Sequence, residues 1–424
     1  MSQHSLSRRE LLQAGAALGL APAWLRGLDA GSLGAERVVV CIQLNGGNDG
    51  LNTVAPVGDD IYHRLRPHLS LETAKGPALK DPALGEHHRW HPSLARTARR
   101  FADGGVAVVQ GVGYPSPNLS HFTSLDFLHS GTCRAPLPAT GWMGRVVDAT
   151  PGKDAKQRTV HDPLTLLAIG PDVAPHMMRA KIAMPVAVPS LEKSVVRAAP
   201  AGASAMEEQA RRAVLESLER ASAAKGVGRD ARIAAAAHAA RQVAVELARA
   251  KDFEPRVEWP DSRLARDLNL AARVISRGLA TRFFFVSQAG YDTHAVQGAP
   301  HAALLAEFDG ALAAFLDELA ARELQDRVLV MTISDFGRRA AQNGKGKSAG
   351  TDHGAASIQM LFGGGIEPGL HGPPPDLANL DENGNLRHRV DFREVYASII
   401  GRWLGADPKA VLGETFAPHP CVRE

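Results

Sequence analysis

Short runs of apolar, largely β-branched residues recur along the chain, and each is bounded by glycine or a polar residue. These runs are RVVVCIQL (37–44), GVAVVQGV (105–112), RFFFVSQA (282–289), RVLVMTIS (327–334) and SIQMLFGG (357–364). Apolar side chains at nearly every position, instead of at alternate ones, are typical of strands that are covered on both faces. The pattern therefore predicts a central, mostly parallel sheet.

Helical patterns lie between and after these strands. A helix expected over 299–321 connects the strands at 282–289 and 327–334, which gives the order of a βαβ unit, and a last helix is expected around 391–404. Residues 204–251 are rich in Ala, Arg and Glu and predict two helices, either a hairpin that covers the sheet or a lid. The expected fold class is α/β, with helices on both sides of the sheet and a helical insertion around 204–251.

The first thirty residues differ from the rest. Arg8 and Arg9 stand in a Ser-Arg-Arg-x-Leu-Leu context, and an uncharged stretch runs from Ala14 to Leu25. This segment resembles a twin-arginine signal peptide, whereas the alternative is a basic amphipathic helix. Its apolar run is shorter than the ~20 residues needed to span a membrane as a helix. We expect export by the twin-arginine translocase, cleavage near Ala30, a periplasmic or secreted domain over 31–424 and no stable membrane insertion.

Composition narrows the class of protein. The 424 residues are 45% hydrophobic and 22% charged, with a formal net charge of +3 at pH 7, so the sequence does not indicate a nucleic-acid-binding surface. The three cysteines, Cys41, Cys133 and Cys421, are widely spaced and form no CxxC motif. They therefore predict neither a disulfide framework nor a thiolate metal site, and Cys41 is expected to be an inert thiol in a core strand.

Polar residues follow the ends of several predicted strands. An aspartate follows each of three strands: Asp49 comes after 37–44, Asp292 after 282–289 and Asp335 directly after 327–334. The carboxyl ends of parallel strands meet at one edge of a sheet, where ligands bind. The same edge should receive four more residues from the adjoining loops: Ser120, His121, His294 and His353.

Such a group of residues points to a metal site. Carboxylates crowded together repel each other unless a cation neutralises them, and a mixture of oxygen and imidazole ligands suits zinc, manganese or a similar ion. Two ions would allow one to activate a nucleophile while both hold a transferring phosphoryl group, and Ser120 would then be activated by a metal ion. Four basic residues on the adjoining loop are candidates for binding anionic oxygens: Arg338, Arg339, Lys345 and Lys347.

Several stretches taken together resemble one protein family. They are QLNGGNDGLNTVAP, GYPSPNLSHF, GYDTHAVQ, SDFGRR with NGKGKSAGTDHG, and DFREVY, and in this order they are similar to DUF1501, a family of exported bacterial proteins placed beside the alkaline phosphatase and sulfatase superfamily. The resemblance implies an alkaline-phosphatase-like fold, a small anionic ester as substrate and one or two divalent ions (zinc, manganese, magnesium or calcium). It also implies two ligand groups, Asp49, Ser120 and Asp335 around one ion and Asp292, His294 and His353 around the other.

The sequence departs from the superfamily pattern at one position. Phosphatases of the superfamily commonly have Asp-His-Gly where this chain has Asp335-Phe336-Gly337. Three outcomes remain open: His353 serves the first ion, His121 compensates, or only one metal binds. The function is accordingly either hydrolysis of phosphate or sulfate esters or, if catalysis is lost, metal binding or assembly of another exported protein. A Rossmann oxidoreductase is disfavoured because NGGNDG lacks the GxGxxG spacing.

Some of these residues have a simpler interpretation. Asp49 and Ser120 are also suitable helix caps. The cluster of His87, His88 and His91 lies far from any predicted strand end, so we expect it to be solvated or packed in the core.

Overall fold

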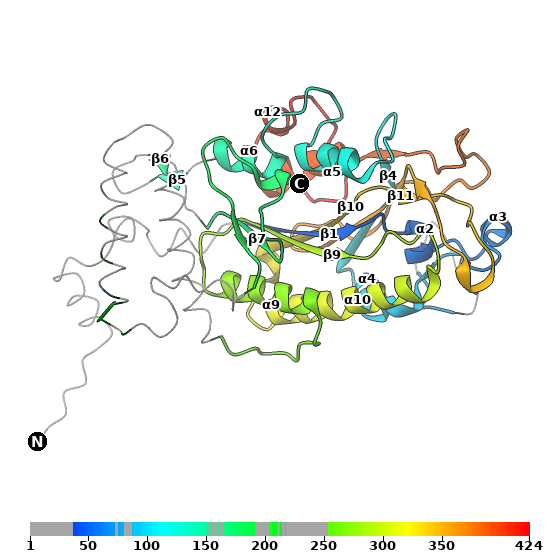
Figure 1. Cartoon of the computed structure of the whole chain (residues 1–424), viewed down its shortest axis with the longest axis horizontal. Helices are drawn as coiled ribbons and strands as arrows, with labels where there is room; N and C mark the ends of the chain where they lie inside the picture. Colours follow the sequence, from blue (N-terminus) through cyan, green and yellow to red (C-terminus); the bar gives the residue numbers. More distant parts are fainter. Residues whose placement is uncertain are drawn as a thin grey trace, which may run out of the picture.

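The computed structural model places a nine-stranded, mostly parallel sheet at the centre of the described chain (Figure 1). The structure describes residues 37–72, 75–79, 87–150, 152–153, 159–160, 164–190 and 253–424, with a few isolated positions between 204 and 217. The strand order is β14-β4-β13-β10-β1-β9-β7-β8, and β15 pairs with β4. Their bounds are β1 Val38–Asn45, β4 Val106–Gly113, β7 Leu166–Ile169, β8 Val186–Val188, β9 Phe283–Ala289, β10 Val328–Ser334, β13 Ser357–Gly363, β14 Gly369–His371 and β15 Val390–Asp391.

All five predicted strands are present, each within one residue of its expected bounds. Four of them, β1, β4, β9 and β10, share one direction, whereas β13 runs antiparallel to both of its neighbours, β10 and β4. The segment between β10 and β13 contains only short β and 3₁₀ elements. A strand parallel to β10 would need a crossover connection, usually a helix, that returns the chain to the opposite edge of the sheet. Since this segment has no such helix, the chain turns back and β13 starts at the edge where β10 ends.

Helices cover both faces of the sheet (Figure 1). Side chains of β1 alternate between two hydrophobic cores, with Val40 and Ile42 in the first and Val39 and Cys41 in the second. Helices α4 (Ala95–Ala102), α9 (Arg263–Ser276) and α10 (Gly298–Ala320) contribute to the first core, and α5 (His121–Ser130), α6 (Trp142–Ala149), α11 (Phe392–Ser398) and α12 (Pro408–Leu412) to the second. Helices α10 and α11 confirm the predictions at 299–321 and 391–404, the latter continuing as a π-helical turn over Ile399–Trp403.

Short helices and strands lie within the loops that connect the main elements. They are α2 (Gly50–Thr53), β2 (Val54–Ala55), α3 (Asp60–Leu65), β3 (Arg89–Trp90), β11 (Gly337–Arg338) and β12 (His353–Gly354), and a further short pair is formed by β5 (Gly152–Lys153) and β6 (Thr159–Val160).

Two predicted segments lie outside the described residues. These are the signal peptide at 1–30 and, apart from isolated positions, the helical insertion around 204–251. Within the described part of the chain, no helix has the length and apolar character needed to cross a membrane. All three cysteines are free, and Cys41 is buried, which raises the pKa of its thiol well above the ordinary value.

The histidines at 87–91 divide between surface and core. His87 is exposed, whereas His88 and His91 are buried. His91 accepts a hydrogen bond at Nδ1 from the Ser93 N–H at 3.1 Å, and its ring packs edge-on against His301. Burial lowers the pKa of His91 to about 4.

Candidate metal centre

Three adjacent strands deliver their following loops to one edge of the sheet. In the order β9-β1-β10, Asn45 pairs with Ala289 and Leu44 with Ser334, so these strands end at the same level. The loops after them touch: Gly46 has φ 118°, and a Cβ atom there would lie 2.4 Å from the backbone nitrogen of Asp292. Only glycine satisfies both conditions, which accounts for part of the glycine-rich stretch after β1.

Three ligand-type side chains converge at this edge. His121, from the first turn of α5, Asp292, from the loop after β9, and His353, from β12, each offer one atom, and these atoms lie within 4.8 Å of one another. His294 is adjacent, since its Nε2 lies 3.1 Å from Asp292 Oδ1 and 2.9 Å from His353 Nε2. We refer to His121, Asp292, His294 and His353 as the His–Asp cluster.

The second ring nitrogen of each histidine has a partner that orients the ring. Nδ1 of His121 lies 2.7 Å from Asp335 Oδ2, that of His294 lies 3.1 Å from Asp352 Oδ1, and that of His353 lies 2.8 Å from the carbonyl oxygen of Leu119. A carbonyl oxygen only accepts, so His353 donates from Nδ1. Carboxylates favour the same arrangement at the other two rings, as they do for histidines that bind metal ions.

This arrangement directs the Nε2 atoms toward the Asp292 carboxylate. His353 Nε2 lies 3.1 Å from Oδ1, and His121 Nε2 lies 3.4 Å from Oδ2. With Nδ1 protonated, a neutral ring has a lone pair on Nε2, and the Nε2 atoms of His294 and His353 are only 2.9 Å apart. Two lone pairs at that distance repel each other unless a proton or a metal ion lies between them.

The electrostatics of the cluster also favour a cation. Burial alone would raise the pKa of Asp292, but the hydrogen bond and the positive charge of Arg338 outweigh it and lower that pKa to about 2. Burial lowers the pKa of His353. Asp292 is therefore a carboxylate at neutral pH and His353 a neutral imidazole, which are the protonation states that bind metal ions.

Phe336 occupies the place where the superfamily pattern has a histidine. Its ring packs against His353 with centroids 4.1 Å apart and against His121 at 4.8 Å. Both histidines that were considered as substitutes thus join the same cluster. Among the described residues, this is the one group of at least three potential ligands that lies close enough together to hold an ion.

Asp335 is buried and directs both carboxylate oxygens to protein groups. Oδ2 binds His121, and Oδ1 accepts a hydrogen bond from the Gly46 N–H at 3.1 Å. Its place in the structure is therefore behind His121, on the side of the ring away from Asp292.

Asp49 is not part of the cluster. Its buried carboxylate forms an ion pair with Arg66, with 2.6 Å between Oδ2 and Nη1, and also accepts from Gln297 Nε2 at 2.5 Å. Burial would raise the pKa of Asp49, but the Arg66 charge and hydrogen bond outweigh it, so the pKa is lowered. Arg66 in turn donates to the carbonyl oxygens of Arg339 and Ala340, which ties the loop after β1 to the loop after β10.

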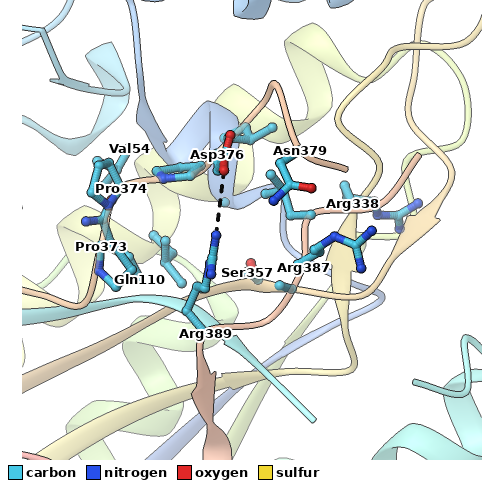
Figure 2. A pocket seen from close by; sticks show the side chains of 17 residues that line it. Val54, Gln110, Arg338, Ser357, Pro373, Pro374, Asp376, Asn379, Arg387 and Arg389 are labelled. Carbon is cyan, nitrogen blue, oxygen red and sulfur yellow. Dashed lines mark ion pairs between the residues drawn. The ribbon is translucent and has the colours of Figure 1, made fainter. Parts of the chain in front are cut away.

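Arg338 is fully buried and joins the same loops from inside. It donates to Asp292 Oδ1 at 2.9 Å and to four carbonyl oxygens, those of Gly46, Gly47, Tyr291 and Thr351. Arg338 also borders a cleft in which Arg389 forms an ion pair with Asp376 at 3.6 Å (Figure 2). Of the three other predicted anion-binding residues, Arg339 is half-buried, and Lys345 and Lys347 are exposed on the loop after β11.

Ser120 is exposed at the N-cap of α5. Its side chain makes no capping hydrogen bond, and its N–H donates to Asn118 Oδ1 at 2.9 Å. The residues on either side of it both contact the cluster, Leu119 through its carbonyl oxygen and His121 through its ring. The Ser120 hydroxyl therefore does not cap helix α5.

Sequence reasoning placed His121 at this edge of the sheet but made it a ligand only as a possible substitute, and it gave no role to Arg66 or Gln297. His121 immediately follows Ser120 in the same loop, so the motif that suggested the serine also contained this signal. Arg66 and Gln297 have no such signal, since their partner Asp49 is distant in sequence and pairs with them only in the folded chain.

Comparison with protein families agrees with the family resemblance found in the sequence. The family described as "Protein of unknown function (DUF1501)" matches residues 93–416, which confirms the resemblance noted above. No curated protein matches the chain.

Among solved structures, similarities are weak in both sequence and geometry. A protein of the alkaline phosphatase superfamily from Vibrio parahaemolyticus has 12% identity and a TM-score of 0.36, over 90% of this chain and 71% of that chain. The PsFucS1 sulfatase from Pseudoalteromonas sp. has 11% identity and a TM-score of 0.38, over 97% and 77%. The C-terminal periplasmic domain of EcEptC from Escherichia coli, in complex with Zn, has 8% identity and a TM-score of 0.34, over 78% and 73%. At these TM-scores the activities of those proteins do not transfer to this chain.

Proposed function

The chain belongs to the DUF1501 family, and we propose that this member is a metal-dependent hydrolase of phosphate or sulfate esters that holds one divalent ion at the His–Asp cluster. One observation carries the proposal. Separate loops bring imidazole Nε2 atoms to a single ionised carboxylate, and the Nδ1 atom of each ring already has a partner. Such an arrangement is costly without a cation and typical of a metal-binding site.

The ligand types favour zinc or manganese among the ions considered. Magnesium and calcium prefer sites made entirely of oxygen atoms, whereas imidazole ligands suit zinc and related transition metals. His121, Asp292 and His353 would hold the ion, with His294 beside them. The side chain of Asp292 is 46% exposed, so the cluster is open to solvent and to a substrate.

A divalent ion bound there would supply a Lewis acid that lowers the pKa of a bound hydroxyl group or water. Ser120 is the proposed nucleophile, because its hydroxyl is exposed and its chain neighbours both contact the cluster. Its oxygen would form a bond to phosphorus or sulfur while the bond to the alcohol oxygen breaks, and water would release the product in a second step. The N-terminus of α5 would attract the anionic oxygens, and the exposed amines of Lys345 and Lys347 would add positive charge nearby.

A second candidate is a metal-binding or assembly factor for another exported protein. The pairing of Asp49 with Arg66 favours it, because a carboxylate expected to bind an ion is neutralised by a buried guanidinium. In this case the fold and the His–Asp cluster would persist without ester hydrolysis. Export through the twin-arginine translocase belongs to both candidates and is tested by following the intact chain in a bacterial periplasm.

Metal analysis of purified protein is the first test. We expect about one zinc or manganese ion per chain in the wild type after metal loading and dialysis, and loss of that ion in His353→Ala. His371→Ala removes a histidine outside the cluster and should keep the metal. A wild type that binds none of the four candidate ions would refute both the hydrolase proposal and the metal-binding alternative.

Activity then separates the two candidates. Loaded protein is assayed with p-nitrophenyl phosphate and p-nitrophenyl sulfate. For a hydrolase, Ser120→Ala should lower the rate at least about a hundredfold while the metal content stays unchanged. Ser348→Ala, on a neighbouring loop, should leave the rate unchanged. Metal binding without hydrolysis of either ester would exclude the hydrolase on these substrates and favour the assembly factor.

A further inference from the structure

A second pocket is lined by Asp335 and Phe336, which also contact the His–Asp cluster, but by none of the four cluster residues. It is bounded by β4, the end of β10, β13 and helices α5 and α11. Most of its lining is apolar, and its residues are Val112, Gly113, Tyr114, Leu128, Ile333, Ser334, Asp335, Phe336, Ala355, Ser357, Ile358, Gln359, Phe392 and Tyr396. We call it the Gln359 pocket.

Gln359 is the unusual residue in this lining. Alternation along β13 places it on the same face of the sheet as Leu361, which belongs to the core beneath α5 and α11. The side chain is 4% exposed, and neither its Oε1 nor its Nε2 atom has a hydrogen-bond partner among the described residues. An amide buried with both ends unpaired costs free energy, so its presence calls for a partner that enters the pocket.

The charge of the lining restricts that partner. No lysine, arginine or histidine side chain lines the pocket. Its one carboxylate, Asp335, is already engaged by Gly46 and His121. The pocket therefore offers no positive charge to a phosphate, a sulfate or a carboxylate, in contrast to the cleft in Figure 2, which Arg387 and Arg389 line.

We propose that the Gln359 pocket binds an uncharged ligand in which an amide group adjoins an apolar group. The amide C=O would accept from Gln359 Nε2 and the amide N–H would donate to Gln359 Oε1, so both unpaired atoms would be satisfied at once. The apolar part would contact side chains such as Leu128, Ile333 and Phe392. This site is separate from the His–Asp cluster, and the inference does not depend on the proposed hydrolase activity.

Three probes of nearly equal size test the proposal. Benzamide carries the amide, toluene lacks it, and benzoate carries a negative charge. Binding is measured by titration calorimetry and ligand-observed NMR on the full chain, with and without a chelator. We expect benzamide to bind at least about tenfold more tightly than either of the other two, and equally well when metal is removed.

Gln359→Leu is the matched variant, since it keeps the size of the side chain and removes both polar atoms. It should lower benzamide affinity at least about tenfold and leave toluene affinity unchanged. Asn379→Ala, in the cleft of Figure 2, is the control and should bind all probes like the wild type. If Gln359→Leu fails to fold, Val112→Phe at the partly exposed rim of the pocket serves instead and should block benzamide. Absence of benzamide binding to the wild type, or binding that survives these variants, would overturn the proposal and assign the pocket to ordered water.

Discussion

Replacement of Asp335 by asparagine tests how the cluster holds its histidines. In the wild type, Asp335 Oδ1 accepts from the fixed backbone N–H of Gly46 and Oδ2 accepts from His121 Nδ1. Asparagine has one acceptor, which remains with Gly46 because that donor cannot change. Its NH₂ group then faces His121, and the ring must turn its own proton to Nε2, where it no longer offers a lone pair to a metal ion.

The size of the effect follows from the same geometry. Loss of a partner behind a metal-binding histidine lowers metal affinity about 10- to 100-fold, or about 1.4–2.7 kcal/mol. We expect Asp335→Asn to fall in this range for zinc, measured by competition with a chelating dye on metal-free protein. His121→Ala should weaken binding at least as much, and the double variant should be no weaker than His121→Ala alone, since Asp335 acts through His121.

Asp309→Asn is the matched control for this experiment. Asp309 is also buried and also accepts from backbone N–H groups, those of Arg96 and Thr97, but it lies on α10 and outside the cluster. Its replacement should lower the free energy of unfolding without changing zinc affinity. If Asp335→Asn binds zinc as tightly as the wild type, or if Asp309→Asn weakens binding equally, the orientation argument fails.

Three further predictions concern stability. Arg66→Met should lower the free energy of unfolding by about 3–5 kcal/mol in denaturant titrations, because Asp49 is left buried without its ion pair; adding Asp49→Asn should recover part of the loss, and a loss below about 1 kcal/mol would contradict the reasoning. Burial lowers the pKa of His129 to about 3 in the folded chain, so as the pH falls below about 6.5 the unfolded chain is protonated at this residue before the folded chain is, and the free energy of unfolding decreases. This residue accounts for about 2 kcal/mol of that decrease at pH 5. His129→Gln should therefore reduce the difference in stability between pH 7 and pH 5 by about this amount, and an unchanged difference would refute the reasoning. Gly47→Ala should lower the free energy of unfolding by about 1–3 kcal/mol, since φ is 90° and a Cβ atom would lie 2.7 Å from the Phe336 ring. Gly104→Ala is the control for the backbone effect alone, because Gly104 has φ 74° and a Cβ atom there would have no atom within 4 Å. Its loss of stability should be smaller, and equal losses would show that the steric argument is wrong.

The sheet was predictable because its strands are apolar at almost every position. The runs at 37–44 and 327–334 became β1 and β10, neighbours in the sheet although nearly 300 residues separate them. The direction of β13 was less accessible, since it depends on a connection without a crossover helix. Helices α4, α6 and α9 were not predicted, although α4 and α9 each have a regular apolar face. Helix α5 was considered only as the alternative in which Ser120 caps a helix, and its apolar residues do not gather on one face.

The sequence predicted where the candidate site lies and named most of its side chains, but it did not show which side chains contact one another. The rule that carboxyl ends of parallel strands meet identifies Asp292 and Asp335 from sequence position alone. It does not say which carboxylate lies among the histidines. Asp292 lies at the centre of the cluster, whereas Asp335 lies behind His121 and Asp49 pairs with Arg66. Those distinctions arise from side-chain directions in loops, which no strand pattern determines.

Arg338 shows why such a site forms only in the complete fold. Sequence reasoning assigned it to an anionic substrate because arginine is the usual partner of phosphate and sulfate oxygens. In the structure its donors are used for loop carbonyl groups and for Asp292, so its charge lowers the pKa of the carboxylate that a metal ion needs. The Arg338 guanidinium therefore links loops from three strands, and it also keeps Asp292 ionised, which is the state that a cation would bind. Under the proposed hydrolase function, a substrate would have to find its positive charge elsewhere, in a bound metal ion and in exposed Lys345 and Lys347, and ester binding should then depend on metal occupancy.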